Sequence, residues 1–183
     1  MMFISLGLGV VIATVMISLV SLATGNGSNA NTKNTTTTLA TTALVGTTIK
    51  PFTMDGLNGG TLRSPWSTGH PAVLIFFASY CGPCQSEMPK VAAYLRAHNE
   101  SPVTIVGVDA SDQRGAAQQF IARDRVGFLV GFDPNDSITS GVFKFWTIPE
   151  TVFVTAKGVV TRVYFGAIPT KDLASGIRSL RAT

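Results

Sequence analysis

The chain has 183 residues, a length that suits one ordinary domain together with shorter additional segments. Charged residues make up only 13% of it and its mean hydropathy is positive (+0.32), which excludes an ordinary, wholly soluble composition and indicates that part of the chain meets lipid. The formal net charge of +4 is too small and too dispersed to identify a partner, and we expect no binding to nucleic acid.

The first segment, residues 1–23, contains an uncharged apolar run of 21 residues from Phe3 to Ala23. As a helix, such a run can span the roughly 30 Å of hydrocarbon in a bilayer, so we expect a transmembrane anchor. The alternative is a cleaved signal peptide, with Ser21 and Ala23 as small residues before the cut. Signal peptides have a shorter apolar core, of about 7 to 15 residues, after a basic start, and no Lys or Arg precedes this run. The pattern favours the uncleaved anchor.

The second segment, residues 24–48, is rich in Thr, Asn and Gly and has almost nothing to bury. Such a composition does not offset the entropy of ordering, so we expect a flexible linker that spans roughly 25 to 30 Å. Lys33 is its only basic residue. The absence of a basic cluster after the apolar run favours an extracytoplasmic location for the rest of the chain, attached to the cell membrane by a single pass.

The third segment, residues 49–183, has the pattern of one α/β domain. The continuous apolar run 72–78, "AVLIFFA", predicts a strand that is covered on both faces at the centre of a sheet. Further extended segments are expected at 51–62 (a hairpin), 103–108, 128–132, 151–155 and 159–165. Helices are expected from the cysteine pair to about residue 98, with a kink at Pro89, then at 115–125, at 136–143 with Asp133 or Asp136 as cap, and at the end, where Leu173, Ile177 and Leu180 form an apolar face. This order predicts a central mixed β-sheet with helices on both faces, whose first half supplies parallel crossovers.

The two cysteines of the chain, Cys81 and Cys84, stand where this central strand gives way to the following helix. The N-terminus of a helix carries partial positive charge and unpaired N–H groups, so we expect the pKa of the Cys81 thiol to be lowered. Cys84 follows within reach of the Cys81 sulfur and can resolve a mixed disulfide formed there. Gly82 permits close approach of a substrate, and Pro83 fits the first turn of a helix. The motif predicts Cys81 as the attacking nucleophile and Cys84 as the resolving thiol.

Two structural interpretations of the pair are weaker. A structural disulfide would close a very short loop and would constrain the unfolded chain little. A zinc site needs four ligands, and His70 and His98 are the only imidazoles available. His98 lies about four helical turns beyond Cys84, too far to share an ion with it.

At these residues the chain resembles the thioredoxin superfamily, and within it the TlpA-like, ResA-like and cytochrome c maturation thiol reductases. The resemblance covers residues 49–180 and rests on "FFASYCGPCQSEMP", which includes Glu87-Met88-Pro89, and on "VTIVGVDASD", "FLVGFDP" and "FKFWTIPETVFVTAKGVV" in the same order. It implies a thioredoxin-like fold and a membrane-tethered, extracytoplasmic enzyme. It also implies that Pro149 is a cis-proline beside the cysteines and that the backbone of Ile148 is presented to an extended substrate segment.

The sequence departs from the family pattern at several positions. Tyr80 stands where Trp is commoner before the first cysteine, and Thr147 stands where glycine is usual, so the approach to Pro149 is more crowded. Ile75 occupies the position at which cytoplasmic thioredoxins carry a buried aspartate. By position, Asp112 is similar to the acidic residue that ResA-like members place near the active site, with Asp109 as the next candidate. Either can assist deprotonation of Cys84, or can be a solvated loop acid that caps the following helix.

The sequence therefore predicts a protein disulfide oxidoreductase that needs no cofactor or metal. The resemblance implies that it reduces disulfide-bearing client proteins and is itself reduced by a membrane thiol donor. The same Cys81–Cys84 pair serves three alternatives: an oxidant that forms disulfides, a peroxidase, and a protein that binds or delivers Cu(I) through two thiolates. The peroxidase is the weakest of them, because the Pro and Thr that precede the reactive cysteine of peroxiredoxins are missing before Cys81.

Overall fold

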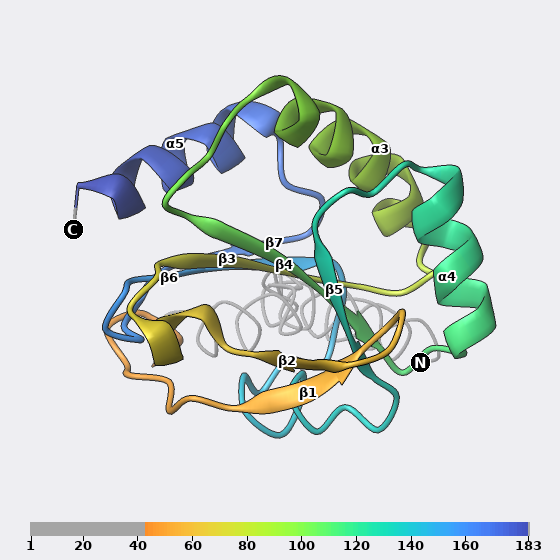
Figure 1. Cartoon of the computed structure of the whole chain (residues 1–183), viewed down its shortest axis with the longest axis horizontal. Coiled ribbons are helices and arrows are strands. Elements are labelled where there is room, and N and C mark those ends of the chain that lie inside the picture. Colours follow the sequence, from red (N-terminus) through yellow and green to blue (C-terminus); the bar gives the residue numbers. More distant parts are fainter. Residues whose placement is uncertain (1–42, 183) are drawn as a thin grey trace, which may run out of the picture. The chain divides into compact units, whose positions relative to one another are not determined.

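The computed structural model describes residues 43–182, which form a seven-stranded sheet with the order β2-β1-β5-β4-β3-β6-β7 (Figure 1). β4 pairs in parallel with β3 and with β5, and the other neighbouring strands are antiparallel. The predicted mixed sheet, with parallel pairing in its first half, is confirmed. The strands are β1 (Thr53–Gly56), β2 (Thr61–Arg63), β3 (Ala72–Phe77), β4 (Thr104–Ala110), β5 (Leu129–Asp133), β6 (Glu150–Val154) and β7 (Val160–Phe165).

β3 lies between β4 and β6, and all of its residues are fully buried. Its register places Phe77 beside Asp109 of β4 and Phe76 beside Glu150 of β6. A strand without polar side chains has no face to offer to water, so both of its faces must be covered. This confirms the prediction of a central strand from the apolar run 72–78.

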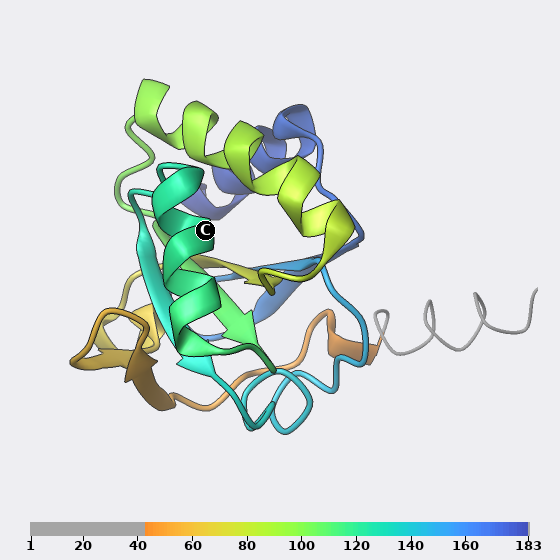
Figure 2. The ribbon, with the colours of Figure 1, turned by 90° about the vertical axis from the view of Figure 1, so that its right-hand side faces the viewer.

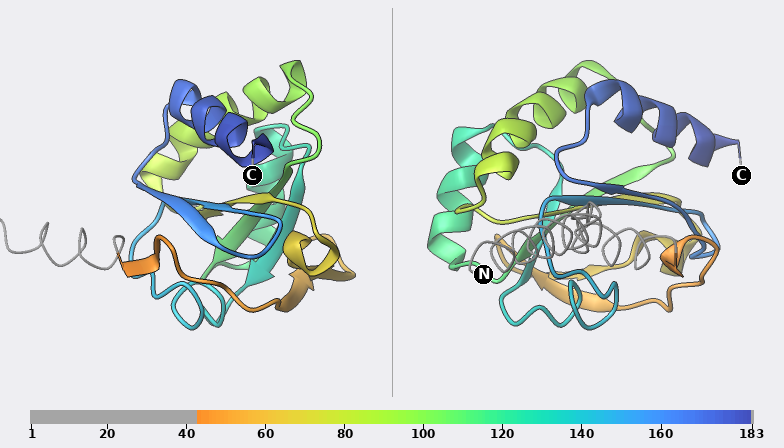
Figure 3. Two further views of the ribbon diagram at one scale, coloured as in Figure 1. Left: turned by 90° about the vertical axis from the view of Figure 1, so that its left-hand side faces the viewer. Right: turned by 180° about the vertical axis from the view of Figure 1, so that it is seen from behind.

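The three longer helices all cover the same face of the sheet, as Figures 1 and 2 show. They are α3 (Gly82–Ala97), α4 (Arg114–Arg123) and α5 (Thr170–Arg181). Met88, Phe120 and Leu173, one from each helix, belong to one core cluster with Ile75 and Phe77 of β3. The views from the side and from behind in Figure 3 show the same arrangement.

The second face of the sheet has a different cover from the one expected. It packs against the 3-10 helix η1 (Pro65–Thr68), which contributes Trp66, and against the irregular segment 134–149, which contributes Phe143 and Phe145. The expectation of α-helices on both faces was therefore wrong. Aromatic side chains do the covering instead: the Phe76 ring centroid lies 5.0 Å from that of Phe143 and 5.1 Å from that of Phe145.

The short helix predicted at 136–143 is also absent, and this segment forms successive turns. The N–H groups of Ser140 and Gly141 both donate to the carbonyl oxygen of Asp136, at 2.9 and 3.0 Å. A Cβ atom on Gly141 would lie 2.0 Å from the Ser137 carbonyl oxygen, so only glycine fits this turn. Asp133 therefore caps no helix, and its carboxylate instead holds these turns by accepting hydrogen bonds from the N–H groups of Ile138 and Thr139.

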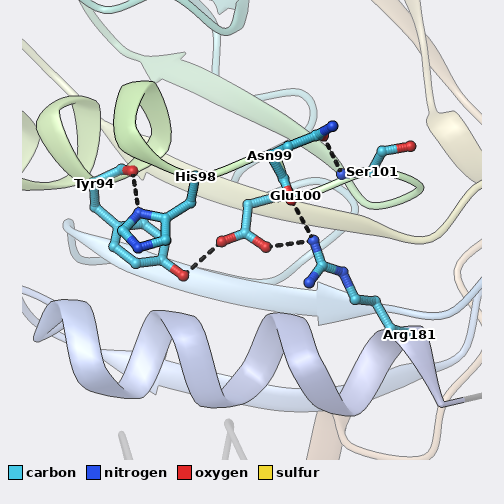
Figure 4. Close-up of polar contacts among 6 residues, drawn as sticks. All are labelled: Tyr94, His98, Asn99, Glu100, Ser101 and Arg181. Atoms are coloured by element: carbon cyan, nitrogen blue, oxygen red, sulfur yellow. Dashed lines mark hydrogen bonds and ion pairs between the residues drawn. The ribbon is translucent and has the colours of Figure 1, made fainter.

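Figure 4 shows the polar contacts that hold the end of α5 to the loop between α3 and β4. The Glu100 carboxylate accepts a hydrogen bond from the Tyr94 hydroxyl at 2.5 Å and lies 2.7 Å from the Arg181 guanidinium. Arg181 also donates to the carbonyl oxygen of Asn99 at 2.7 Å. Burial and the contact with Glu100 raise the pKa of Tyr94 to about 12. These contacts lie at the opposite end of α3 from the cysteine pair.

Within residues 43–182, no helix has both the length and the apolar character needed to cross a membrane. The predicted anchor, residues 1–23, and most of the predicted linker, residues 24–48, lie outside the described residues.

Candidate active site

Cys81 and Cys84 form a disulfide at the beginning of α3, with an S–S distance of 2.03 Å and a Cα–Cα distance of 5.2 Å. β3 ends at Phe77, three residues form a tight connection, and Cys81 is the N-cap residue of α3. The N–H of Cys84 donates to the Cys81 sulfur at 3.2 Å. This N–H is one of the unpaired donors of the helix start, so it favours negative charge on Cys81 when the disulfide is open.

The two cysteines differ in exposure. Cys81 is 8% exposed and Cys84 is completely buried. Pro83 lies in the first turn of α3, as predicted, and a Cβ atom on Gly82 would meet no atom within 4 Å, so the space in front of the pair is open. A reacting group from solvent can therefore approach Cys81 but not Cys84.

The peptide bond between Ile148 and Pro149 is cis, as the resemblance implied. Glu150 follows it and pairs with Phe76, so Pro149 lies beside the chain that leads from β3 to Cys81. Ile148 is half-buried and packs against the core cluster that contains both cysteines. The structure thus brings Ile148 and Pro149 to the cysteine end of the sheet, where Tyr80 is also exposed.

The two aspartates that the sequence singled out have different environments. Asp112 accepts a hydrogen bond from the Ser79 N–H and another from the Gln113 N–H, both at 2.6 Å, so it ties the segment before Cys81 to the start of α4. Asp109 is completely buried in β4, and its carboxylate accepts no hydrogen bond from an N–H or hydroxyl group of the described residues. Burial raises the pKa of Asp109 to about 8, together with the negative charge of Asp112 and a side-chain hydrogen bond between the two carboxyl groups.

Side-chain alternation places Asp109 on the helix-covered face of the sheet. Ile105 of the same strand belongs to the core beneath the helices, whereas Val106 and Val108 belong to the core of the opposite face. Asp109 therefore lies on the same side as Phe77 and α3. It is a buried acid at the cysteine end of the sheet, although the usual position for such an acid, Ile75, is apolar.

Glu87 lies on α3 one turn after Cys84 and is only 2% exposed. Its Oε1 accepts a hydrogen bond from the Ile168 N–H at 2.9 Å, while Oε2 has no partner among the described residues. Burial raises the pKa of Glu87 to about 7, and the hydrogen bond from Ile168 opposes this shift. Glu87 thus connects the cysteine helix to the segment between β7 and α5.

A third buried acid, Glu150, was not predicted. It is 1% exposed, its Oε1 accepts a hydrogen bond from Thr147 Oγ1 at 3.0 Å, and its Oε2 has no partner among the described residues. Burial raises the pKa of Glu150 to about 8, and the contact with Thr147 opposes this shift. The sequence did contain a signal, because Glu150 shares the strand face of Val152 and Val154 and must be buried with them.

Within residues 43–182, no group of three or more His, Cys, Asp and Glu side chains is arranged to hold a metal ion. The arrangement is suited to thiol chemistry: a reachable sulfur at a helix N-terminus, a buried sulfur next to it, a cis-proline and three buried carboxyl groups.

The fold and this site define a thioredoxin-like thiol–disulfide oxidoreductase. The chain belongs to the AhpC/TSA family, whose model matches residues 45–163, more than half of its length. It is similar to the thiol-disulfide oxidoreductase ResA of Geobacillus kaustophilus, with 23% identity over 77% of this chain and 80% of that one. It is also similar to the thiol:disulfide interchange protein DsbE of Pseudomonas fluorescens biotype C, with 29% identity over 68% of each chain.

The chain is also similar to solved structures of disulfide oxidoreductases. The structure of MTB dsbF has a TM-score of 0.62 and 31% identity, and the match covers 70% of this chain and 94% of that one. A secreted Mycobacterium tuberculosis disulfide oxidoreductase homologous to E. coli DsbE has a TM-score of 0.61 and 27% identity, over 70% and 96% of the two chains. The resemblance to ResA-like members of the thioredoxin superfamily is therefore confirmed.

Proposed function

We propose that this protein is tethered to the membrane, faces the extracytoplasmic side and reduces disulfide bonds of client proteins with Cys81 and Cys84. The observation that carries the proposal is the unequal exposure of the two cysteines, 8% against 0%, at the positive end of α3. Only the first sulfur can meet a client, and only the second is placed to release it. Thiol–disulfide exchange through a pair of cysteines requires these two roles, and in the reductive direction they are attack on the client and its release.

The reaction consists of two exchanges in which atoms and electrons balance. The Cys81 thiolate attacks one sulfur of the client disulfide, an S–S bond forms between Cys81 and the client, and the other client sulfur leaves as a thiolate. Cys84 then loses its proton and attacks the Cys81 sulfur, which forms the intramolecular disulfide and releases the second client thiolate. The client gains two electrons, the enzyme loses two, and protons from solvent neutralise the client thiolates.

Asp109 is the best candidate to take the proton from Cys84. Both carboxylate oxygens of Asp112 already accept backbone hydrogen bonds, so Asp112 positions the segment before Cys81. Asp109 is buried beside Asp112 and accepts no backbone hydrogen bond from the described residues, and its pKa of about 8 makes it an effective proton acceptor and donor near neutral pH. Ile148 and Pro149 would receive the client as an extended segment beside Cys81.

The tether and the electron source complete the proposal. The apolar run from Phe3 to Ala23 is the proposed membrane anchor, and residues 24–48 are the proposed flexible linker between the anchor and the catalytic domain. A reductase outside the cytoplasm must itself be reduced, and a membrane protein that carries thiol electrons outward is the class of donor that fits. A membrane-impermeant thiol reagent that labels reduced Cys81 in intact cells would support this topology, and labelling only after lysis would contradict it.

Client trapping tests the reductase directly. In the full-length Cys84→Ser protein, the client remains joined to Cys81, because the second exchange cannot occur. We expect adducts in solubilised membranes that disappear on reduction and that are absent from the Cys81→Ser, Cys84→Ser double variant. The absence of adducts from native membranes would contradict the proposal.

The reduction potential decides between reductase and oxidant. We expect a value nearer to that of thioredoxin, about −270 mV, than to that of the oxidant DsbA, about −120 mV. Equilibration of the full-length protein with glutathione buffers gives this potential. A value close to that of DsbA would assign the same residues to disulfide formation.

A further inference from the structure

A small cavity of about 210 Å³ lies next to the cysteine pair. Its wall includes Tyr80, the residue before Cys81, and Ile148, the residue before cis-Pro149. Under the proposed function, on which this inference rests, a client cysteine must lie between these two positions. The cavity is smaller than the roughly 300 to 1,000 Å³ of small-molecule sites, so it suits one side chain of the client beside its cysteine.

Two exposed aromatic residues form the rim of the cavity. Trp146 is 83% exposed and Tyr80 is 63% exposed, and they are the only exposed aromatic residues in the described part of the chain. Aromatic side chains are costly to leave in water and are enriched where proteins make contacts. Their faces also attract cations, with Trp the strongest of the aromatic residues in this respect.

The interior of the cavity is polar and acidic. Ser111, Thr139 and Asp136 contribute to it, and among the described residues that line it Asp136 is the only charged one. The Asp136 Oδ2 accepts a hydrogen bond from Ser111 Oγ, and Oδ1 receives none from any described residue. One carboxylate oxygen is therefore available to a ligand.

The cations nearest in sequence to this wall have partners that do not line the cavity. Lys144 donates to the carbonyl oxygen of Gly141 at 2.6 Å. Arg114 donates to the carbonyl oxygens of Gly56 and Leu57 and lies over the ring of Phe132.

The charges around Tyr80 support an acidic environment. Burial raises the pKa of the Tyr80 hydroxyl, and the negative charges of Asp112 and Asp136 raise it further. The field at the rim of the cavity is therefore negative, which agrees with the single acidic residue inside it.

We propose that this cavity is a specificity pocket for a basic client side chain, a lysine or an arginine next to the client cysteine. The cation would lie between the faces of Trp146 and Tyr80 and would pair with the free oxygen of Asp136. An apolar side chain would remove Asp136 from water without a partner, and an acidic one would meet repulsion, so both are disfavoured. Thus charge complementarity determines the choice among disulfide-bearing clients.

Model peptides of the form Ala-X-Cys-X-Ala, supplied as disulfide-linked dimers with X as Lys, Met or Glu, test the proposal. The measurement is the second-order rate constant for their reduction by the reduced full-length protein in detergent, at about 0.15 M salt. We expect the Lys peptide to react roughly five- to tenfold faster than the Met peptide, and the Glu peptide to be the slowest. The Asp136→Asn and Trp146→Ala variants should each reduce the Lys-to-Met ratio to below about twofold.

Asp55→Asn is the matched control, because it removes one exposed acid of the β1–β2 hairpin and should leave the ratio unchanged. Equal rates for all peptides, faster reduction of the Met or Glu peptide, or a Lys preference that survives both Asp136→Asn and Trp146→Ala would overturn the pocket. Reduction of the uncharged hydroxyethyl disulfide separates the two proposals. If the protein reduces it but shows no Lys preference, only the pocket fails; if it reduces neither this compound nor any peptide, the proposed function fails as well.

Discussion

Thr147 donates a hydrogen bond to Glu150 at 3.0 Å across the cis bond between Ile148 and Pro149. Glycine, which is usual at this position in the family pattern, has no side chain to make this contact. Thr147 also lines the cavity beside Tyr80, so one residue connects the buried acid to the surface that receives the client. Thr147 thus supplies a specific partner for Glu150, and the crowding expected at position 147 stays a prediction.

The Glu150 carboxyl group should make stability depend on pH. Its pKa is raised from the ordinary value of 4.5 to about 8, so between these pH values the folded state holds a proton that the unfolded state has released. The free energy of unfolding therefore falls as pH rises through this window and levels off above it. We expect Glu150→Gln to flatten this decline by roughly 1 to 3 kcal/mol between pH 5 and pH 8 in urea unfolding experiments. An unchanged slope would show that Glu150 does not carry the raised pKa.

Removal of the Thr147 hydroxyl should shift the same profile. The contact with Thr147 favours the charged form of Glu150, so Thr147→Val should raise the pKa of Glu150 further and extend the decline in stability to higher pH. Thr155→Val is the control, because Thr155 makes its hydrogen bonds within the turn before β7. A shift of the profile to lower pH in Thr147→Val would contradict the assignment.

Asp109→Asn should slow the release of clients. If Asp109 takes the proton from Cys84, its loss should reduce the rate of the second exchange by about tenfold to a hundredfold, while the attack by Cys81 is less affected. Rapid-mixing experiments on a preformed mixed disulfide of Cys81 measure this step separately. Asp112→Ala should instead disturb the segment before Cys81, because the N–H groups of Ser79 and Gln113 both lose their acceptor, and so should slow the first exchange. Equal effects of Asp109→Asn on both exchanges would remove the assigned role.

The tight turn at Gly141 should be sensitive to a single methyl group. A Cβ atom there would lie 2.0 Å from the Ser137 carbonyl oxygen, so Gly141→Ala should destabilise the fold by roughly 1 to 3 kcal/mol. In the matched variant Gly115→Ala, the new Cβ meets no atom within 4 Å on helix α4, and a stabilisation of up to about 1 kcal/mol is expected. Urea unfolding of both variants checks the contrast, and similar effects of the two changes would contradict it.

The cluster in Figure 4 should contribute to stability but not to the reaction. Glu100 is the shared partner of Tyr94 and Arg181, and only 8% of its side chain is exposed. We expect Arg181→Ala to lower the free energy of unfolding by about 0.5 to 2 kcal/mol and to leave the rate of hydroxyethyl disulfide reduction unchanged. A large loss of rate at unchanged stability would reveal a connection between the two ends of α3.

Much of the fold follows from local patterns. The apolar run 72–78, bounded by Pro71 and the polar Ser79, favours a buried strand, and Pro83 just after Cys81 favours the start of a helix. The elements that pack against the second face of the sheet could not be predicted from such local patterns. Apolar residues of segment 134–149 indicate burial but not whether a helix or successive turns bury them, and the turns depend on Asp133, Asp136 and Gly141 together.

The residues of the site that belong to a sequence motif could be predicted, whereas the roles of its acidic residues could not. Cys81, Cys84 and cis-Pro149 lie as the pattern indicates. The difference between Asp109 and Asp112 depends on which backbone N–H groups each carboxylate reaches, which spacing alone does not reveal. Glu150 was missed because an acid after a proline resembles a turn residue until the strand register places it beside Phe76.

The pH dependence of alkylation of Cys81 tests the central claim most directly. In the reduced full-length protein, iodoacetamide should modify Cys81 well before Cys84, and the half-maximal rate should lie at a clearly lower pH than for free cysteine under the same conditions. The positive end of α3 and the Cys84 N–H provide the reason. A titration at or above that of free cysteine, or faster modification of Cys84, would contradict the account.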